Sequence, residues 1–309
     1  MKNIVTEQTF YKYLKCPHWL VYDRDKGTDL RDALLEKLQD DGLLPEKEYE
    51  LIKDKEVSVV DLEDIDEAAQ KTIELMRQGA STIYKGVLAY ENWVGHPDLL
   101  ERVEGKSEFG NWYYVACDIK RSQHLKMEYR YQGAFYAMIL EKIQGVRPVQ
   151  GYIMRSDGKV ESFLLSEVLP DFHLALDEIE DILAGHNPEH FLTSACKQSP
   201  WFHACRRLTE EQGDLSLINR IWRSEIKALR AAGITTVEEL ASISEKKLEE
   251  VSGISRDRLQ FLHLQALALT ENKIIRLADI QWPDNNYAKL IIDVESDPLR
   301  DIDYLIGVL

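Results

Sequence analysis

Long apolar runs are missing from this sequence of 309 residues. No stretch approaches the roughly 18–20 apolar residues that a helix needs to span a bilayer, so we expect no transmembrane segment. The N-terminal residues, Met1 to Glu7, also lack the apolar core of a secretory signal peptide. Both absences predict a cytoplasmic protein.

Cysteine is scarce as well, with four residues at positions 16, 117, 196 and 205. A framework of disulfides is not expected in a cytosolic chain of this length, which can bury a substantial core without cross-links. The cysteines are therefore candidates for metal binding or for plain burial.

Positive charge is in short supply, because 38 Lys and Arg face 54 Asp and Glu and give a net charge of −16. This balance argues against a protein that coats nucleic acid with a broad basic surface. It does not exclude an enzyme that needs only a local basic track. Acids crowd residues 46–67. Basic side chains gather in one later stretch, at Lys120, Arg121, His124, Lys126 and Arg130.

Hydrophobic periodicity predicts an α/β domain over residues 1–207. Leu30, Leu34 and Leu38 recur at helical spacing, and a second helix is expected over 65–78. Aromatic and β-branched residues then dominate 84–119, which is typical of two or three antiparallel strands. The clearest of these strands is 112–120.

The order of the next elements favours a mixed sheet flanked by helices. A helix is expected over 128–143, and Asp157-Gly158 between two apolar runs predicts a hairpin of 149–155 with 160–165. Another amphipathic helix is expected over 170–184.

Beyond this domain, residues 214–272 are predicted to be all-helical, with turns at Gly233-Ile234 and Gly253-Ile254. Two apolar strands follow, over 289–295 and 304–309. A terminal apolar strand leaves an unpaired edge, so we expect the natural protein to continue beyond residue 309.

Asp98, Asp118 and Lys120 carry the chemistry that we expect of this chain. Alternate side chains of a strand share a face, so Asp118 and Lys120 point the same way, and a hairpin can return Asp98 to their side. Two adjacent carboxylates raise each other's pKa, and Mg²⁺ relieves this repulsion. The backbone carbonyl of Ile119 is a further candidate ligand. Lys120 would orient or deprotonate the attacking water and offset charge on a phosphate.

The following helix adds Gln132 and Tyr136, which are four residues apart and therefore share a face. They are candidates to touch a nucleic-acid backbone or the attacking water. Alternatively, Gln132 is a packing residue and Tyr136 belongs to the core.

In combination, three segments resemble the RecB-like branch of the PD-(D/E)XK nuclease superfamily. They are GHPDLL (95–100), YVACDIK (114–120) and YQGAFY (131–136). More narrowly, the chain resembles a bacterial group of RecB-like nucleases in which a helical hairpin module and an RNase H-like exonuclease domain follow the nuclease domain. The resemblance covers nearly the whole chain and implies a nuclease domain over 1–207, a helix-hairpin-helix-like module over 214–272 and the start of a truncated RNase H-like domain over 286–309.

This resemblance implies a restriction-endonuclease-like α/β core in which Asp98 and Asp118 bind Mg²⁺ or Mn²⁺. It also implies that Lys120 is catalytic and that Gln132 and Tyr136 complete the helix motif. Many relatives place a further metal-binding His in an early helix, and no His lies between residues 28 and 42 here. The candidates to replace it are Asp29, Asp32 and Glu36.

The same branch often holds a four-cysteine iron–sulfur cluster. Cys16, Cys196 and Cys205 match three of its ligands, and Ser199 stands at the fourth position, where a hydroxyl is a poor iron ligand. Three alternatives stay open: no cluster, a cluster with another fourth ligand or three irons, or a zinc site with His18 or His203. Cys117 is expected in the core, pointing away from Asp118.

Two further resemblances concern the second half of the chain. Asp293 and Glu295 resemble the first motif of DEDD-type exonucleases, but the rest of that site is missing, so we expect no activity there. The turns at Gly233 and Gly253 resemble helix-hairpin-helix units, which aim backbone N–H groups at phosphate. Candidate contacts are Arg220, Arg223, Lys227 and Arg230, and the alternative is a helical spacer.

The sequence therefore predicts a cytoplasmic Mg²⁺- or Mn²⁺-dependent nuclease that acts on single-stranded DNA or duplex ends. The alternative is a DNA-binding or assembly module with a degenerate nuclease fold. The absent early His and Ser199 favour the alternative, whereas Asp98, Asp118 and Lys120 favour the enzyme.

Overall fold

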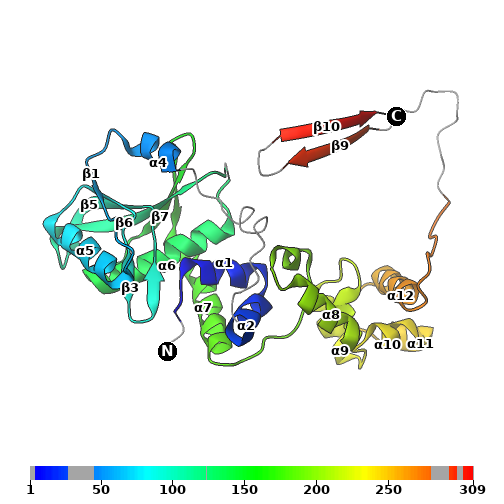
Figure 1. Ribbon diagram of the computed structural model, residues 1–309. Helices are drawn as coiled ribbons and strands as arrows, with labels where there is room; N and C mark the ends of the chain where they lie inside the picture. Colours follow the sequence, from blue (N-terminus) through cyan, green and yellow to red (C-terminus); the bar gives the residue numbers. More distant parts are fainter. Residues whose placement is uncertain (1–3, 27–44, 123, 280–291, 298–301, 309) are drawn as a thin grey trace. The chain divides into compact units, whose positions relative to one another are not determined.

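The computed structural model describes residues 4–26, 45–122, 124–279, 292–297 and 302–308 (Figure 1). Contacts divide the chain into two compact units, with the division between Pro188 and Glu189. The domain limits expected from the sequence stay predictions. No helix in the described ranges is both long enough and apolar enough to cross a membrane.

A mixed sheet of six strands forms the framework of the first unit, in the order β1-β2-β5-β6-β7-β8. Neighbours are antiparallel except for β1 with β2 and β6 with β7, which are parallel. The strands are β1 (Val57–Val59), β2 (Thr82–Tyr84), β5 (Leu99–Ser107), β6 (Gly110–Lys120), β7 (Gln150–Arg155) and β8 (Val160–Leu164). The expected α/β fold with a mixed sheet is confirmed.

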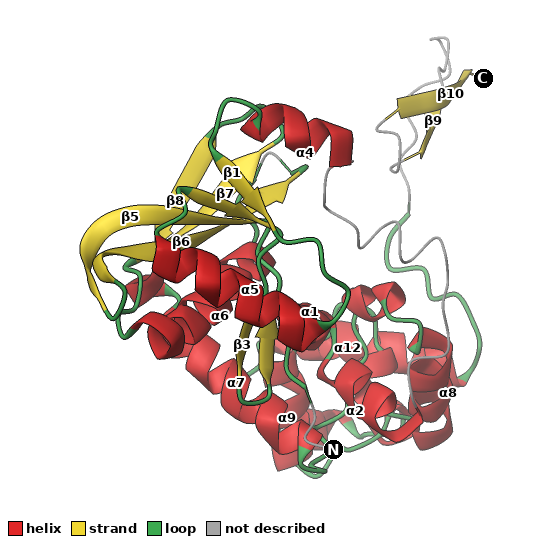
Figure 2. Ribbon diagram, turned by 60° about the vertical axis from the view of Figure 1, so that its left-hand side comes forward, coloured by secondary structure: helices red, strands yellow, loops and turns green. Residues whose placement is uncertain are grey.

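Helices cover both faces of this sheet (Figures 1 and 2). One face carries α5 and α6, and α4 lies on the other. The first unit contains α1 (Glu7–Lys15), α2 (Pro17–Lys26), α4 (Pro45–Ile52), α5 (Ile65–Gln78), α6 (Met127–Gln144), the 3₁₀ turn η1 (Leu165–Glu167) and α7 (Leu169–Leu183). A small separate hairpin consists of β3 (Leu88–Tyr90) and β4 (Trp93–Gly95).

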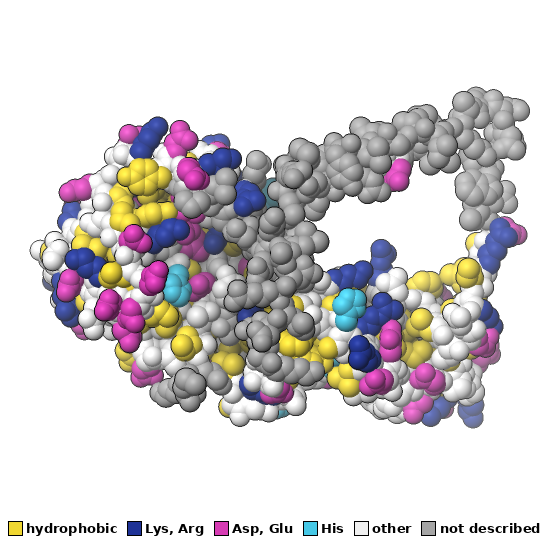
Figure 3. All heavy atoms as spheres, viewed as in Figure 1, with side chains coloured by type: hydrophobic (Ala, Val, Ile, Leu, Met, Phe, Trp, Pro, Cys, Tyr) yellow, Lys and Arg dark blue, Asp and Glu magenta, His cyan; other side chains and the backbone are white. Residues whose placement is uncertain are grey.

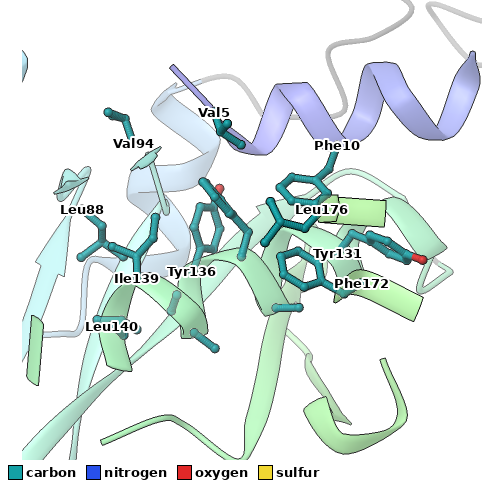
Figure 4. Packing of buried hydrophobic residues seen from close by; sticks show 14 of the residues in the cluster. Val5, Phe10, Leu88, Val94, Tyr131, Tyr136, Ile139, Leu140, Phe172 and Leu176 are labelled. Atoms are coloured by element: carbon teal, nitrogen blue, oxygen red, sulfur yellow. The ribbon is translucent and has the colours of Figure 1, made fainter. Parts of the chain in front are cut away.

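Strand alternation in β6 divides its side chains between two apolar clusters. Tyr114 and Ala116 join the large cluster formed with α1, α2, α5, α6 and α7. Cys117 and Ile119 face the other way and pack with Ile52 of α4. Cys117 is therefore a core residue on the face opposite Asp118, as expected. The large cluster also holds the stacked rings of Phe10 and the α7 residue Phe172 (Figure 4).

Several predicted elements are confirmed within a residue or two. Helix α5 has the expected bounds because the Asp64 side chain accepts the backbone N–H of Glu67 at its start, and Gly79 takes the left-handed conformation at its end. The β7–β8 hairpin turns at Gly158, whose φ of +78° favours glycine. The expected helix around Leu30, Leu34 and Leu38 lies outside the described residues.

Gln144, at the end of α6, joins this helix to β6. Its side chain is fully buried, and its Oε1 accepts the backbone N–H of Tyr114 at 2.8 Å. Its Nε2 donates to the carbonyls of Tyr114 and Val146, both at 3.0 Å. A single amide thus satisfies three backbone groups and ties α6 to the strand that carries Asp118.

The second unit is all-helical over 214–272, as the sequence predicts. Its elements are η2 (Ser194–Gln198), α8 (Phe202–Gln212), η3 (Leu215–Leu217), α9 (Arg223–Ala231), α10 (Val237–Ala241), α11 (Glu245–Glu249) and α12 (Arg256–Thr270). They surround a separate core that includes Leu229, Leu240 and Leu262, none of which is exposed. Gly233 and Gly253 have φ of +79° and +85° and turn the chain between helices.

Near the C-terminus, β9 (Ile292–Asp297) and β10 (Ile302–Val308) form an antiparallel pair. Both strands were expected. The first residues of the expected strand 289–295 lie outside the described residues.

Candidate functional site

Asp98 and Asp118 lie side by side because β5 and β6 pair in a defined register. Leu99 is opposite Cys117, so Asp98, one residue before β5, falls next to Asp118. The backbone N–H of Asp98 donates to Asp118 Oδ1 at 3.3 Å, and the N–H of Ile119 donates to Asp98 Oδ2 at 2.8 Å. The structure thus brings together the two carboxylates that we expected to meet.

Lys120 joins them from the same face of β6. Its Nζ lies 3.2 Å from Asp118 Oδ2, and it also lies over the ring of Tyr129 at 5.7 Å from the centroid. The Lys120 side chain is 14% exposed and that of Asp118 only 3%. The pair is consequently sheltered from solvent, where charge–charge interactions are stronger than at an open surface.

Burial and the nearby negative charge of Asp118 raise the pKa of Asp98 to about 7. Burial is the largest cause, the charge of Asp118 adds to it, and Lys120 opposes it. Burial alone would lower the pKa of Lys120, but the charges of Asp118 and Asp98 raise it above its ordinary value. The ammonium of Lys120 therefore keeps its proton, which favours an orienting and charge-offsetting role over that of a base.

Tyr136 reaches the same site from α6. Its hydroxyl lies 3.5 Å from Asp118 Oδ2 and 3.4 Å from the carbonyl oxygen of His96. Its ring is held in the large apolar cluster, near Val94 and Ile139 in Figure 4. Burial and the nearby charge of Asp118 raise its pKa well above the ordinary value, so this phenol stays protonated.

Gln132 lies one turn before Tyr136 and is also buried, at 7% exposure. Its Oε1 is buried and has no hydrogen-bond partner in the described part of the chain. A buried acceptor without a protein partner is unusual, because buried polar groups are nearly always hydrogen-bonded. The catalytic roles of Gln132 and Tyr136 stay predictions.

Two acids that the sequence did not indicate also approach the site. Glu7, the first residue of α1, pairs with His96 at 3.5 Å, while its Oε2 is buried with no partner among the described residues. Glu48 of α4 accepts the hydroxyl of Tyr84 at 2.7 Å and contributes to the raised pKa of Asp98. Both lie far from Asp98 in the sequence, so no local pattern could have revealed them.

The chemistry of these donors suits a hard divalent cation. Carboxylate oxygens are the preferred ligands of Mg²⁺, which binds through one or two carboxylates and otherwise keeps water and substrate phosphates. Burial and the charge of Asp118 both raise the pKa of Asp98, and a bound cation would favour the charged form of this carboxylate. Within the described ranges, no three His, Cys, Asp or Glu side chains form a metal-binding group. The residues therefore fit a Mg²⁺ site with two carboxylate ligands.

The sequence predicts further ligands of this metal at Ile119 and in an early helix. The Ile119 side chain is fully buried, and its N–H binds Asp98, but the role of its carbonyl stays a prediction. Asp29, Asp32 and Glu36 lie outside the described residues.

The candidate cluster cysteines are all buried. Cys16 ends α1 in the first unit, whereas Cys196 in η2 and Cys205 in α8 belong to the second unit. The Cys196 sulfur accepts the backbone N–H of Thr193 at 3.3 Å. Ser199 is buried too, and its hydroxyl accepts the N–H of Trp201 at 3.1 Å, so it shapes the turn before α8. The iron–sulfur cluster stays a prediction.

In the helical module, the predicted DNA-contacting cations differ in how they are used. Arg230 pairs with Glu189 and, at 2.8 Å, with the buried Asp214, so it stabilises the module. The guanidinium of Arg223 lies over the ring of Phe191 at 4.4 Å. Arg220 and Lys227 are exposed.

The DEDD-like motif lies on β9. Its Asp293 is exposed, and the side chain of its Glu295 is outside the described part of the structure.

Compared with known proteins, the chain gives no match to any family model and no match to a curated protein.

Proposed function

We propose that the protein is a Mg²⁺- or Mn²⁺-dependent nuclease that hydrolyses phosphodiester bonds of DNA at single strands or duplex ends. Its first unit would be a RecB-like PD-(D/E)XK nuclease domain with a restriction-endonuclease-like core. The observation that carries the proposal is the convergence of Asp98, Asp118 and Lys120 in one sheltered site.

The topology around the site supports this proposal. Asp118 and Lys120 stand at the end of β6, and α6, the next element along the chain, returns Tyr136 to Asp118. Strand β7 then pairs parallel to β6, so α6 forms the crossover between two parallel strands. The segment 98–136 thus supplies a compact site from consecutive elements.

In this mechanism, the carboxylate oxygens of Asp98 and Asp118 would hold the cation. The ion, when bound, polarises a phosphate oxygen and makes a bound water more acidic. The protonated ammonium of Lys120 orients the attacking water and offsets negative charge that builds on the phosphate.

Tyr136 and Gln132 complete the site from the helix. The protonated hydroxyl of Tyr136 holds Asp118 in place through Oδ2. The unpartnered Oε1 of Gln132 is an acceptor for the attacking water. The buried surroundings of both side chains exclude other water from this side of the site.

The test compares cleavage of end-labelled single-stranded and duplex DNA by the wild type, Asp118→Asn and Asp177→Asn, with Mg²⁺ or Mn²⁺ and with chelator. Asp177 is an exposed acid on α7 and serves as the matched control. We expect the wild type and the control to cleave only with metal, and Asp118→Asn to lose at least about 10²-fold in rate.

Cleavage that is equal in the wild type and Asp118→Asn would show that another site, or a contaminant, is responsible. A wild type that binds DNA without cleaving it under any of these conditions would support the degenerate DNA-binding module instead.

A further inference from the structure

The second unit contains a pocket that the nuclease site does not account for. It has a volume of about 510 Å³ and lies between the segment that runs through η2 into α8 and the loop that joins η3 to α9. Its walls include Phe191, Phe202, Lys197, Arg206 and Arg220. All of these residues belong to the second unit.

The charge of this pocket is opposite to that of the chain as a whole. Its described lining residues include three cations and no carboxylate, although the protein has a net charge of −16. Arg206 pairs with Glu210 at 2.8 Å, but no ion pair within the described residues occupies Lys197 or Arg220, which are both exposed. In Figure 3, Lys and Arg side chains gather over the part of this unit that holds α8. The pocket therefore attracts an anion.

Aromatic rings accompany these cations. Phe191 and Phe202 are half-buried and line the pocket, and the guanidinium of Arg223 already lies over Phe191. Rings beside cations are the combination by which proteins bind single-stranded nucleic acid, because bases stack on the rings and phosphates meet the charges.

The wall of the pocket also contains a buried hydroxyl. Ser216 lines the pocket and is 6% exposed, and its Oγ has no hydrogen-bond partner among the described residues. Its backbone N–H is satisfied by Asp214 at 2.8 Å, so only the hydroxyl is left over. Buried polar groups are nearly always paired, so an unpaired hydroxyl in the pocket wall is unusual.

The loop that presents Arg220 is held in place before any ligand arrives. Arg220 has a φ of +57°, an unusual conformation for a residue with a side chain. Arg258 donates to the Arg220 carbonyl at 2.6 Å and is itself paired with Glu225 at 2.7 Å. A loop that is already ordered loses little entropy when it binds a ligand.

We propose that this pocket binds one nucleotide of a single-stranded nucleic acid, with the base against Phe202 and the phosphate at Lys197 and Arg220. The volume suits a ligand the size of a single nucleotide. The proposal rests on the proposed function only in taking the ligand to be nucleic acid, and it does not require cleavage.

The experiment measures fluorescence anisotropy of a labelled oligothymidylate with the full chain carrying Asp118→Asn, in chelator, so that no cleavage occurs. In this background we compare Lys197→Ala/Arg220→Ala, Phe202→Leu and the control Lys246→Ala, an exposed cation on α11. Thermal melting verifies that each variant folds. An oligouridylate and free thymidine monophosphate as competitors distinguish DNA, RNA and mononucleotide as the ligand.

We expect the double variant and Phe202→Leu each to weaken binding by about tenfold or more, and Lys246→Ala to leave it within about twofold. The double variant should also reduce the salt dependence of binding. Equal binding by all folded variants, or no binding by the parent chain, would overturn the proposal. If the pocket variants weaken binding but the wild type does not cleave DNA, only the proposed nuclease activity is contradicted. If the wild type cleaves DNA but the pocket variants bind as the parent does, only the proposed pocket is contradicted.

Discussion

Gln144 offers the sharpest test of how the candidate site is held together. Its buried amide satisfies the N–H and carbonyl of Tyr114 and the carbonyl of Val146. Leu has nearly the same volume and no polar atoms. Gln144→Leu should therefore fill the space and leave three backbone groups without partners.

The expected loss follows from these three groups. A buried polar group without a partner costs about 1–3 kcal/mol, and the added apolar burial of Leu offsets part of the sum. We expect the free energy of unfolding to fall by about 3–5 kcal/mol. Because stabilities of domains are about 5–15 kcal/mol, such a loss is large.

Urea unfolding followed by circular dichroism measures the loss, with Gln78→Leu as the control. Gln78 is an exposed residue near the end of α5, so its replacement should change stability by less than about 0.5 kcal/mol. A loss below about 1 kcal/mol for Gln144→Leu, with an unchanged slope against urea, would refute this account of the α6–β6 connection.

Three further predictions follow from the packing and the charges. In Gly151→Ala, the new Cβ would overlap Phe163 Cζ and lie 2.8 Å from Phe163 Cε1, so we expect the free energy of unfolding to fall by about 1–3 kcal/mol. In a double-mutant cycle measured by unfolding, Phe163→Leu should partly relieve this loss. The pKa of Glu225 is lowered, because the hydrogen bond from Arg258 outweighs the partial burial that disfavours the charged form. The charged carboxylate therefore stabilises the fold above the unfolded pKa of about 4.3, and this stabilisation is lost as pH falls through the folded pKa. Glu225→Gln should accordingly cost about 0.5–1 kcal/mol at neutral pH and progressively less in melts below about pH 4. Lys120→Met should reduce metal-dependent cleavage by at least about 10²-fold without abolishing DNA binding in a filter assay, and unchanged cleavage would exclude the role given to Lys120.

The parts of the site that are local in sequence could be predicted. Alternation along β6 places Asp118 and Lys120 on one face, and a simple hairpin brings Asp98 alongside. Helix α6 exceeds its predicted limits by one residue at each end, and Gly145 ends it in the left-handed conformation that glycine favours. Such features depend on strand and helix periods and on the conformational preferences of glycine.

Other parts could not be predicted because they depend on contacts between distant segments. Glu7 and Glu48 approach the site because of how α1 and α4 pack. The sequence pattern of a helix indicates which face is buried but not the element against which that face packs. The parallel pairing of β6 with β7 likewise depends on how α6 crosses the sheet. The pocket at Phe202 and Ser216 joins segments that share no sequence motif.

Strand β6 is hydrogen-bonded to β5 on one side and to β7 on the other. The amide protons of a strand paired in this way exchange with deuterated solvent only when the sheet opens, and the slowest of them report on global unfolding. The framework of Asp118 and Lys120 should therefore persist for as long as the fold itself does. We therefore expect a partly unfolded form that lacks this site but keeps the rest of the first unit to be rarely populated. The site and the fold of the first unit should be lost at the same rate.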